Sequence, residues 1–96
     1  MPNVDLFMDE VVADFRRRLA LLGDGGDRRA IEDGIALLTD SRLRGIDAAA
    51  FEELLSTLRA GRAPAGHYVL QPEKIAGELA RRWQRYAAEA AVPALN

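Results

Sequence analysis

His67 is the only histidine of the chain, so it is the first residue to consider for acid–base or nucleophilic chemistry. A serine nucleophile would need to be presented on a sharp turn between a strand and a helix, and neither Ser41 nor Ser56 lies in a Gly-x-Ser-x-Gly sequence. The chain contains no cysteine. We therefore expect no enzyme activity, and we interpret His67 as a surface or hinge residue.

Adjacent carboxylates occur at three places. Acid–base catalysis needs two carboxyl groups that face one pocket with separated pKa values, whereas neighbours on a helix point about 100° apart. We expect these carboxylates to solvate polar helix faces. The pairs are Asp9-Glu10, Glu32-Asp33 and Glu52-Glu53.

The glycine-rich segment 23–29 precedes an expected helix, which is where phosphate-binding loops form. It follows a helix rather than a strand, lacks a Gly-Lys-Ser/Thr ending, and carries Asp24 and Asp27, which repel anions. It also lacks the spaced oxygen ligands of a calcium loop. We interpret it as a turn between helices, and we expect no metal and no cofactor.

Two arginine clusters could contact phosphates: residues 16–18, and Arg81, Arg82 and Arg85. If the two clusters met, they would form one arginine-rich surface. The chain as a whole has a formal charge of −2, which gives no long-range attraction for a polyanion. An arginine-dependent nucleic-acid binder is therefore the second alternative function.

Composition favours one small domain over residues 1–96, since 49% of the residues are hydrophobic and no linker or repeat interrupts the chain. The first ten residues resemble no signal peptide, and no apolar run is long enough to span a membrane. We expect a cytoplasmic location. The preference for arginine over lysine and the abundance of alanine suggest a bacterial origin.

Apolar residues recur at three- and four-residue steps through most of the chain, which predicts an all-α domain of four helices. Gly23 is expected to cap the end of the first helix and Asp27 the start of the second. Gly34 lies on the apolar edge of the second helix, where it would let another helix approach closely. The predicted helices cover about 4–22, 28–39, 48–60 and 72–91.

Helix signals are clearest in the second half of the chain. Asp47 is expected as the N-cap of the third helix and Gly61 at its end. Pro72 suits the first position of the last helix, and Pro93 should end it. Between them lies a connector, residues 61–71, whose Tyr68-Val69-Leu70 run is the one β-prone stretch of the chain.

The segment 54–79 contains an ordered series: a helix ending in Leu-Arg, a glycine break, a tyrosine with an apolar residue, a polar turn, and a helix starting Ile-Ala. These features are Leu58-Arg59, Gly61, Tyr68-Val69, Pro72-Glu73-Lys74 and Ile75-Ala76 with Leu79. The series resembles the C-terminal region of the flagellar anti-sigma factors. The resemblance implies that the two C-terminal helices wrap a transcription sigma factor and mask its polymerase-binding surface.

The predicted helices are amphipathic and contain few aromatic residues, and their apolar stripes can be buried in two ways. The stripes can bind a protein partner, which predicts a non-catalytic bacterial regulator of the anti-sigma kind. Alternatively, the same residues form the internal core of a four-helix monomer or of a homodimeric bundle that serves as a structural or accessory subunit. The candidate partner-binding residues are Leu55, Leu58, Tyr68, Ile75, Leu79 and Trp83.

Overall fold

Four α-helices form the whole of the regular structure in the computed structural model, which describes residues 3–91. The helices are α1 (Val4–Leu19), α2 (Gly26–Arg44), α3 (Ala48–Arg59) and α4 (Pro72–Ala91). The prediction of an all-α domain is confirmed. Within the described residues, none of the helices has the length and apolar character needed to cross a membrane.

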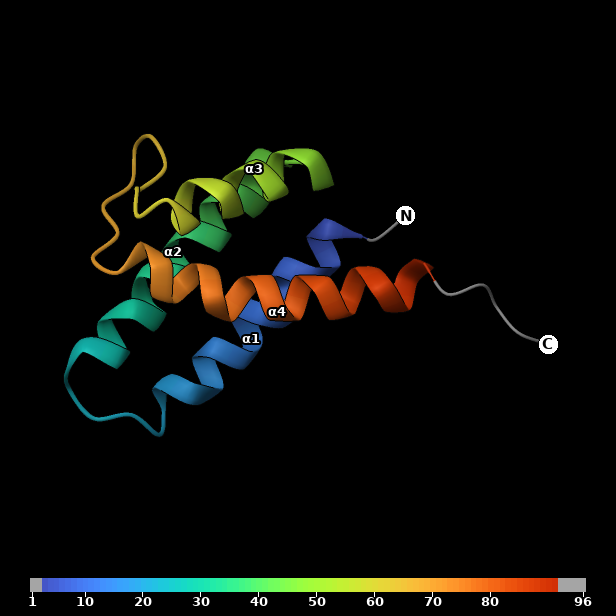
Figure 1. The fold of residues 1–96 in the computed structure, drawn as a ribbon. Coiled ribbons are helices and arrows are strands. Elements are labelled where there is room, and N and C mark those ends of the chain that lie inside the picture. Colours follow the sequence, from blue (N-terminus) through green and yellow to red (C-terminus); the bar gives the residue numbers. More distant parts are fainter. Residues whose placement is uncertain (1–2, 92–96) are drawn as a thin grey trace.

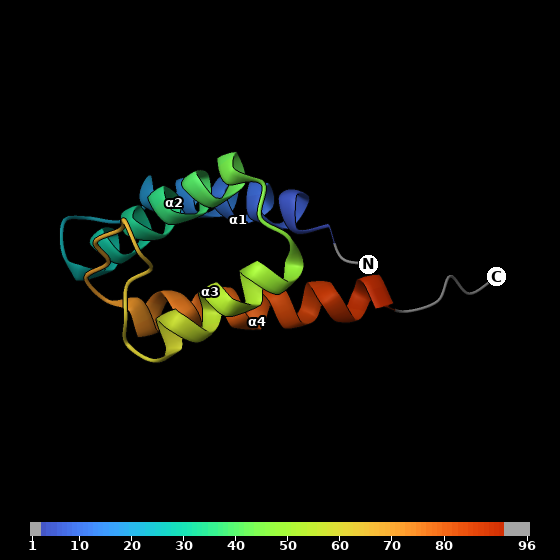
Figure 2. The same cartoon turned by 90° about the horizontal axis from the view of Figure 1, so that it is seen from above.

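The helices are arranged as two hairpins. α1 packs along α2, and α3 packs along α4, and these are the two most extensive helix contacts of the molecule (Figure 1). Seen from above, each hairpin forms one layer, with the α1–α2 layer facing the α3–α4 layer (Figure 2). α4 joins the layers, because it also contacts both α1 and α2.

α1 ends three residues earlier than the sequence predicted. The helix stops at Leu19, its C-cap is Ala20 in a right-handed conformation, and Gly23 does not adopt the left-handed conformation expected of a capping glycine. The Arg28 guanidinium donates hydrogen bonds to the carbonyl oxygens of Leu19 and Leu22, at 3.1 and 3.3 Å. A side chain of the next helix thus binds the carbonyl of the last residue of α1 and one carbonyl of the following turn, in place of a glycine cap.

α2 is longer than predicted at both ends. Its N-cap is Gly25 and Asp27 lies inside the first turn, so the prediction of an Asp27 cap is wrong. Asp27 still carries a negative charge near the positive end of the helix dipole. The helix continues through Ser41 to Gly45, whose left-handed backbone (φ 68°) closes it through a hydrogen bond to the Arg42 carbonyl.

The boundaries of α3 and the start of α4 follow the sequence signals. The Asp47 carboxylate accepts a hydrogen bond from the Ala50 N–H at 2.8 Å, which confirms it as N-cap. Gly61 is left-handed (φ 78°) just after α3, as expected of a terminating glycine. Pro72 is the first residue of α4, where its missing N–H costs nothing. The predicted role of Pro93 lies outside the described residues.

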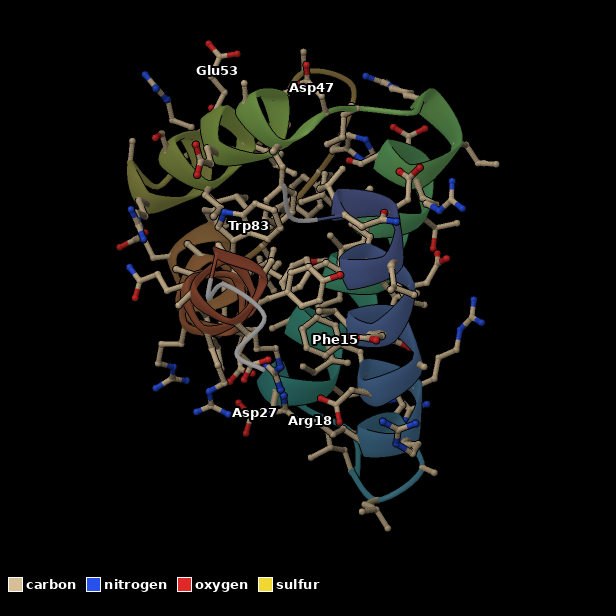
Figure 3. All side chains as sticks on the ribbon, turned by 90° about the vertical axis from the view of Figure 1, so that its right-hand side faces the viewer. Phe15, Arg18, Asp27, Asp47, Glu53 and Trp83 are labelled. Atoms are coloured by element: carbon tan, nitrogen blue, oxygen red, sulfur yellow. The ribbon has the colours of Figure 1, made fainter. Side chains whose placement is uncertain are left out.

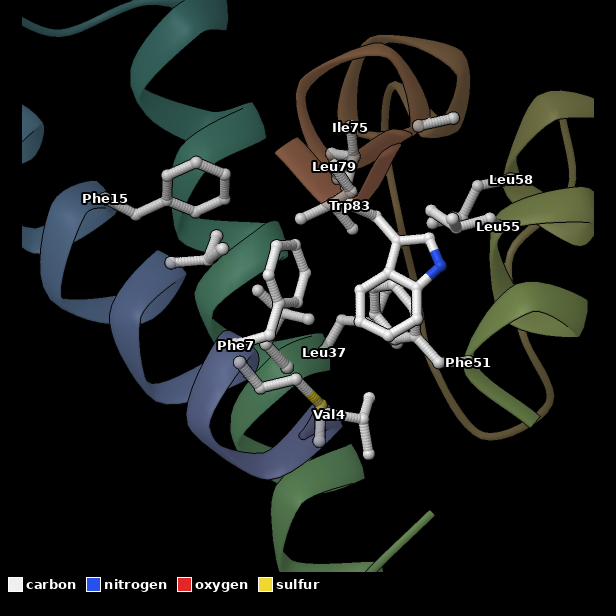
Figure 4. Packing of buried hydrophobic residues seen from close by; sticks show 14 of the residues in the cluster. Val4, Phe7, Phe15, Leu37, Phe51, Leu55, Leu58, Ile75, Leu79 and Trp83 are labelled. Carbon is white, nitrogen blue, oxygen red and sulfur yellow. The ribbon is translucent and has the colours of Figure 1, made fainter. Parts of the chain in front are cut away.

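An aromatic cluster joins the two hairpins in the core. Phe7 of α1 lies 5.5 Å from Phe51 of α3 and 5.0 Å from Trp83 of α4, measured between ring centroids. Phe51 and Trp83 are 4.9 Å apart, and Tyr86 packs on Phe7 at 5.3 Å. Edge-on and tilted pairs at these separations are favourable beyond the area they bury. The cluster therefore ties α1 directly to the second hairpin (Figure 4).

Close packing of α1 on α2 depends on Gly34. A Cβ atom at Gly34 would lie 3.0 Å from the ring of Phe15 in α1 and 3.9 Å from the Ile75 side chain in α4. The predicted close approach at this glycine is confirmed, and the Phe15 ring that lies against it is fully buried.

Candidate functional site

Five of the six residues predicted to bind a partner lie in the core of the chain itself. All five are buried, and Trp83, the largest of them, is only 4% exposed. In the stick view Trp83 points inward from α4, whereas Asp47 and Glu53 project outward from α3 (Figure 3). The apolar stripes could either bind a partner or form the internal core, and in the structure these five side chains form part of the internal core. They are Leu55, Leu58, Ile75, Leu79 and Trp83.

Tyr68, the sixth predicted residue, is on the surface. Its side chain is 71% exposed, the next residue Val69 is buried in the core, and Leu70 is 50% exposed. This alternation is typical of an extended chain, yet the β-prone run forms no strand here because no other strand in residues 3–91 is available to pair with it. Tyr68 and Leu70 thus form a small apolar surface on the connector, which we call the connector face.

Side chains and one backbone carbonyl of α2 hold the connector in place. The Asp33 carboxylate accepts a hydrogen bond from the Leu70 N–H at 3.1 Å. The Arg29 guanidinium lies over the Tyr68 ring, 5.8 Å from its centroid, and also pairs with Asp33 at 3.1 Å. Gln71 donates to the Gly26 carbonyl oxygen at 3.3 Å. The C-terminal part of the connector is therefore attached to the first half of α2.

His67 makes the second attachment. Its Nε2 atom lies 2.9 Å from Asp40 Oδ2, and Arg44 Nε lies 3.0 Å from the same oxygen. The His67 side chain is largely covered and borders a groove of about 390 Å³ between α2, α3 and the connector, which Ser41 also lines. Among residues 3–91, His67 makes no side-chain hydrogen bond to Ser41 or Ser56. Its geometry is that of a residue fastening the connector to α2.

Sequence reasoning did not identify the residues of α2 that hold the connector. Their positions, 26, 29, 33 and 40, are separated by steps of three, four and seven residues. Such steps place residues along one side of a helix, so the signal was present in the spacing. It was not recognised because these residues are polar, and only apolar periodicity was used to define helix faces.

The two arginine clusters meet at the seam between α1 and α4. Glu78 accepts hydrogen bonds from Arg18 and from Arg82, both at 2.7 Å, and Arg82 also donates to Asp14 at 2.8 Å. Arg18 and Arg82 lie over the ring of Phe15, at 5.7 and 5.3 Å from its centroid. Partial burial favours a raised pKa for Glu78, but the hydrogen bonds from Arg82 and Arg18 outweigh it and lower its pKa.

The glycine-rich segment 23–29 is held by contacts from the start of α4 and from the residue before it. Lys74 of α4 forms an ion pair with Asp27, and Gln71 binds the Gly26 carbonyl, so residues from the start of α4 pack against the loop. Among residues 3–91 no group of three or more His, Asp or Glu side chains could hold a metal ion. The loop has the geometry of a turn between α1 and α2.

The connector face is the candidate functional site, since it combines exposed apolar side chains with a backbone fixed to a helix. Comparison with protein-family models, curated proteins and solved structures yields no match for this chain.

Proposed function

We propose that this chain is a non-catalytic regulatory protein of the bacterial cytoplasm that binds a protein partner through its connector face. The observation that supports the proposal is the combination at Tyr68 and Leu70 of high exposure with a fixed backbone. Tyrosine is enriched among the residues that contribute most to protein interfaces. A connector already held on α2 loses little conformational freedom when it is bound, and this favours affinity.

A transcription sigma factor is the specific partner suggested by the resemblance of residues 54–79 to flagellar anti-sigma factors. Two binding modes are then distinct. In the first mode, the partner contacts the connector face and leaves the core intact. In the second mode, α3 and α4 separate from the α1–α2 hairpin and wrap the partner, which requires Phe51 and Trp83 to leave Phe7. Because separation would expose the aromatic cluster to water, we favour the first mode.

The first test is a comparison of co-purified proteins. The tagged chain and its Tyr68→Ala variant are used to capture partners from lysate of the source cells, with quantitative mass spectrometry as the readout. The matched control is Leu43→Ala, since Leu43 is also a highly exposed apolar residue but lies near the end of α2. We expect Tyr68→Ala to lower recovery of the partner about tenfold. Equal recovery with both variants would contradict the proposal.

The second test separates the two binding modes. Trp83 is the only tryptophan of the chain, so incorporation of fluorotryptophan gives a single fluorine NMR signal from the core. Addition of a purified flagellar-type sigma factor should leave this signal at its buried position while Tyr68→Ala weakens binding. A shift of the signal to that of the unfolded chain would instead support wrapping by α3 and α4.

A further inference from the structure

We infer that the seam between α1 and α4 is a second interaction surface, which binds a short acidic segment of a protein. Its core is four arginines around two carboxylates, which leaves a formal excess of two positive charges. We call this group the arginine face. It consists of Arg17, Arg18, Arg81 and Arg82, with Asp14 and Glu78 beneath them.

The arginines of this face have two different roles. Arg18 and Arg82 are partly buried and make short ion pairs with Glu78, which hold their guanidinium groups in orientation. Arg17 and Arg81 are 72% and 79% exposed, and their guanidinium nitrogens lie 3.6 and 3.8 Å from the nearest carboxylates. Those separations are longer than hydrogen bonds, so the donors of Arg17 and Arg81 are available to another acceptor.

The carboxylates of the face are recessed. Glu78 is only 21% exposed and Asp14 is 36% exposed, both well below Arg17 and Arg81. A molecule that approaches the seam therefore meets guanidinium groups first. Guanidinium groups bind carboxylates through two parallel hydrogen bonds, and arginines held in place by a neighbouring ion pair lose less freedom on binding. Figure 3 shows Arg18 at this seam, outside the buried ring of Phe15.

The surroundings of the face favour a short ligand. Toward the end of α4, Glu10 and Glu89 line the groove that contains Arg82 and Arg85. Toward its start, Glu73 lies together with Arg59 and Lys74 in the shallow groove that contains Arg81. Carboxylates thus lie among the basic side chains on both sides, so a long polyphosphate chain would meet repulsive groups along its length, whereas a short acidic peptide needs only the arginines of the face. We therefore assign the face to an acidic protein segment rather than to nucleic acid.

Fluorescence anisotropy tests this assignment directly. The probe is a fluorescein-labelled decapeptide of alternating Glu and Ser, and the reference peptide has Gln in place of Glu. The test variant is Arg17→Gln/Arg81→Gln, which preserves the short ion pairs to Glu78. The control variant, Arg42→Gln/Arg62→Gln, removes the same charge elsewhere on the surface. Circular dichroism checks that both variants keep the helicity of the native chain.

We expect the native chain to bind the Glu peptide and not the Gln peptide. The test variant should bind it about fivefold more weakly, and the control variant should change binding less than about twofold. Equal losses in both variants, or no binding of the Glu peptide, would overturn the assignment. Tighter binding of a single-stranded oligonucleotide of equal charge would also overturn it. None of these outcomes bears on Tyr68, because the connector face and the arginine face belong to different elements.

Discussion

Replacement of Glu78 by glutamine should destabilise the fold by removing the charge shared by Arg18 and Arg82. Glu78 accepts short hydrogen bonds from both guanidinium groups. A hydrogen bond to a charged group is worth about 1.5–3 kcal/mol when well covered, but the arginines are 38% and 33% exposed, and solvent screens such pairs. Glutamine can still accept one neutral hydrogen bond. We therefore expect a loss of about 2 kcal/mol in the free energy of unfolding, or about 10 °C in melting temperature.

The effect should depend on pH with a defined sign. Since the pKa of Glu78 is lowered below its ordinary value of 4.5 in the folded chain, its contribution to stability is fully present above pH 4.5. It is lost as the pH falls through the lower folded pKa. The difference in unfolding free energy between the native chain and Glu78→Gln should be constant from about pH 7 to 5 and should shrink toward pH 3.

Urea unfolding followed by circular dichroism at a series of pH values measures this difference. The matched control is Glu89→Gln, the same substitution on the exposed surface of α4. The control should change the unfolding free energy by less than about 0.5 kcal/mol at every pH. A Glu78→Gln variant as stable as the control at pH 7, or a difference that grows toward acid, would refute the reasoning.

Three further substitutions test other parts of the fold. Trp83→Ala should lower the free energy of unfolding by about 3–5 kcal/mol, because it leaves a cavity in the aromatic cluster. Chemical denaturation measures this loss, and a variant as stable as the native chain would be inconsistent with the packing. Gly77→Ala should raise the melting temperature, since an added Cβ meets no atom within 4 Å and alanine favours a helix by about 1 kcal/mol. Gly61→Ala should lower the free energy of unfolding by about 1–2 kcal/mol, because the left-handed conformation penalises any Cβ. Equal effects of the two glycine substitutions in thermal melts would contradict the assigned backbone conformations.

Local signals predicted the helices well wherever the determining atoms are close in sequence. The Asp47 cap, the terminating Gly61 and the initiating Pro72 each depend on residues within one turn. The end of α1 was misplaced because the carbonyl of its last residue, Leu19, and that of Leu22 in the following turn are bound by Arg28, which belongs to the next helix. The local sequence at the end of a helix contains no signal for a cap that comes from another element.

The candidate site was only partly predictable for the same physical reason. Tyr68 was selected together with five apolar residues, but periodicity cannot distinguish a stripe covered by the chain itself from one left for a partner. Packing of the second hairpin against the first buries those five residues, while the α2 side chains Arg29 and Asp33 hold the connector with Tyr68 outward. The way in which the two hairpins pack together decides which apolar side chains are buried. That packing depends on contacts between residues far apart in sequence.

Formation of the two hairpins requires only contacts between neighbouring helices. α1 and α2 are complete by Arg44, and α3 and α4 occupy the chain from Ala48 onward. Domains rich in local contacts fold quickly, so each hairpin should form early. Contacts between Phe7 and Trp83, by contrast, close a loop that includes most of the chain. During synthesis the first hairpin therefore leaves the ribosome before the rings of α3 and α4 that pack on Phe7, and the cluster around Phe7 is complete only when α4 has been made.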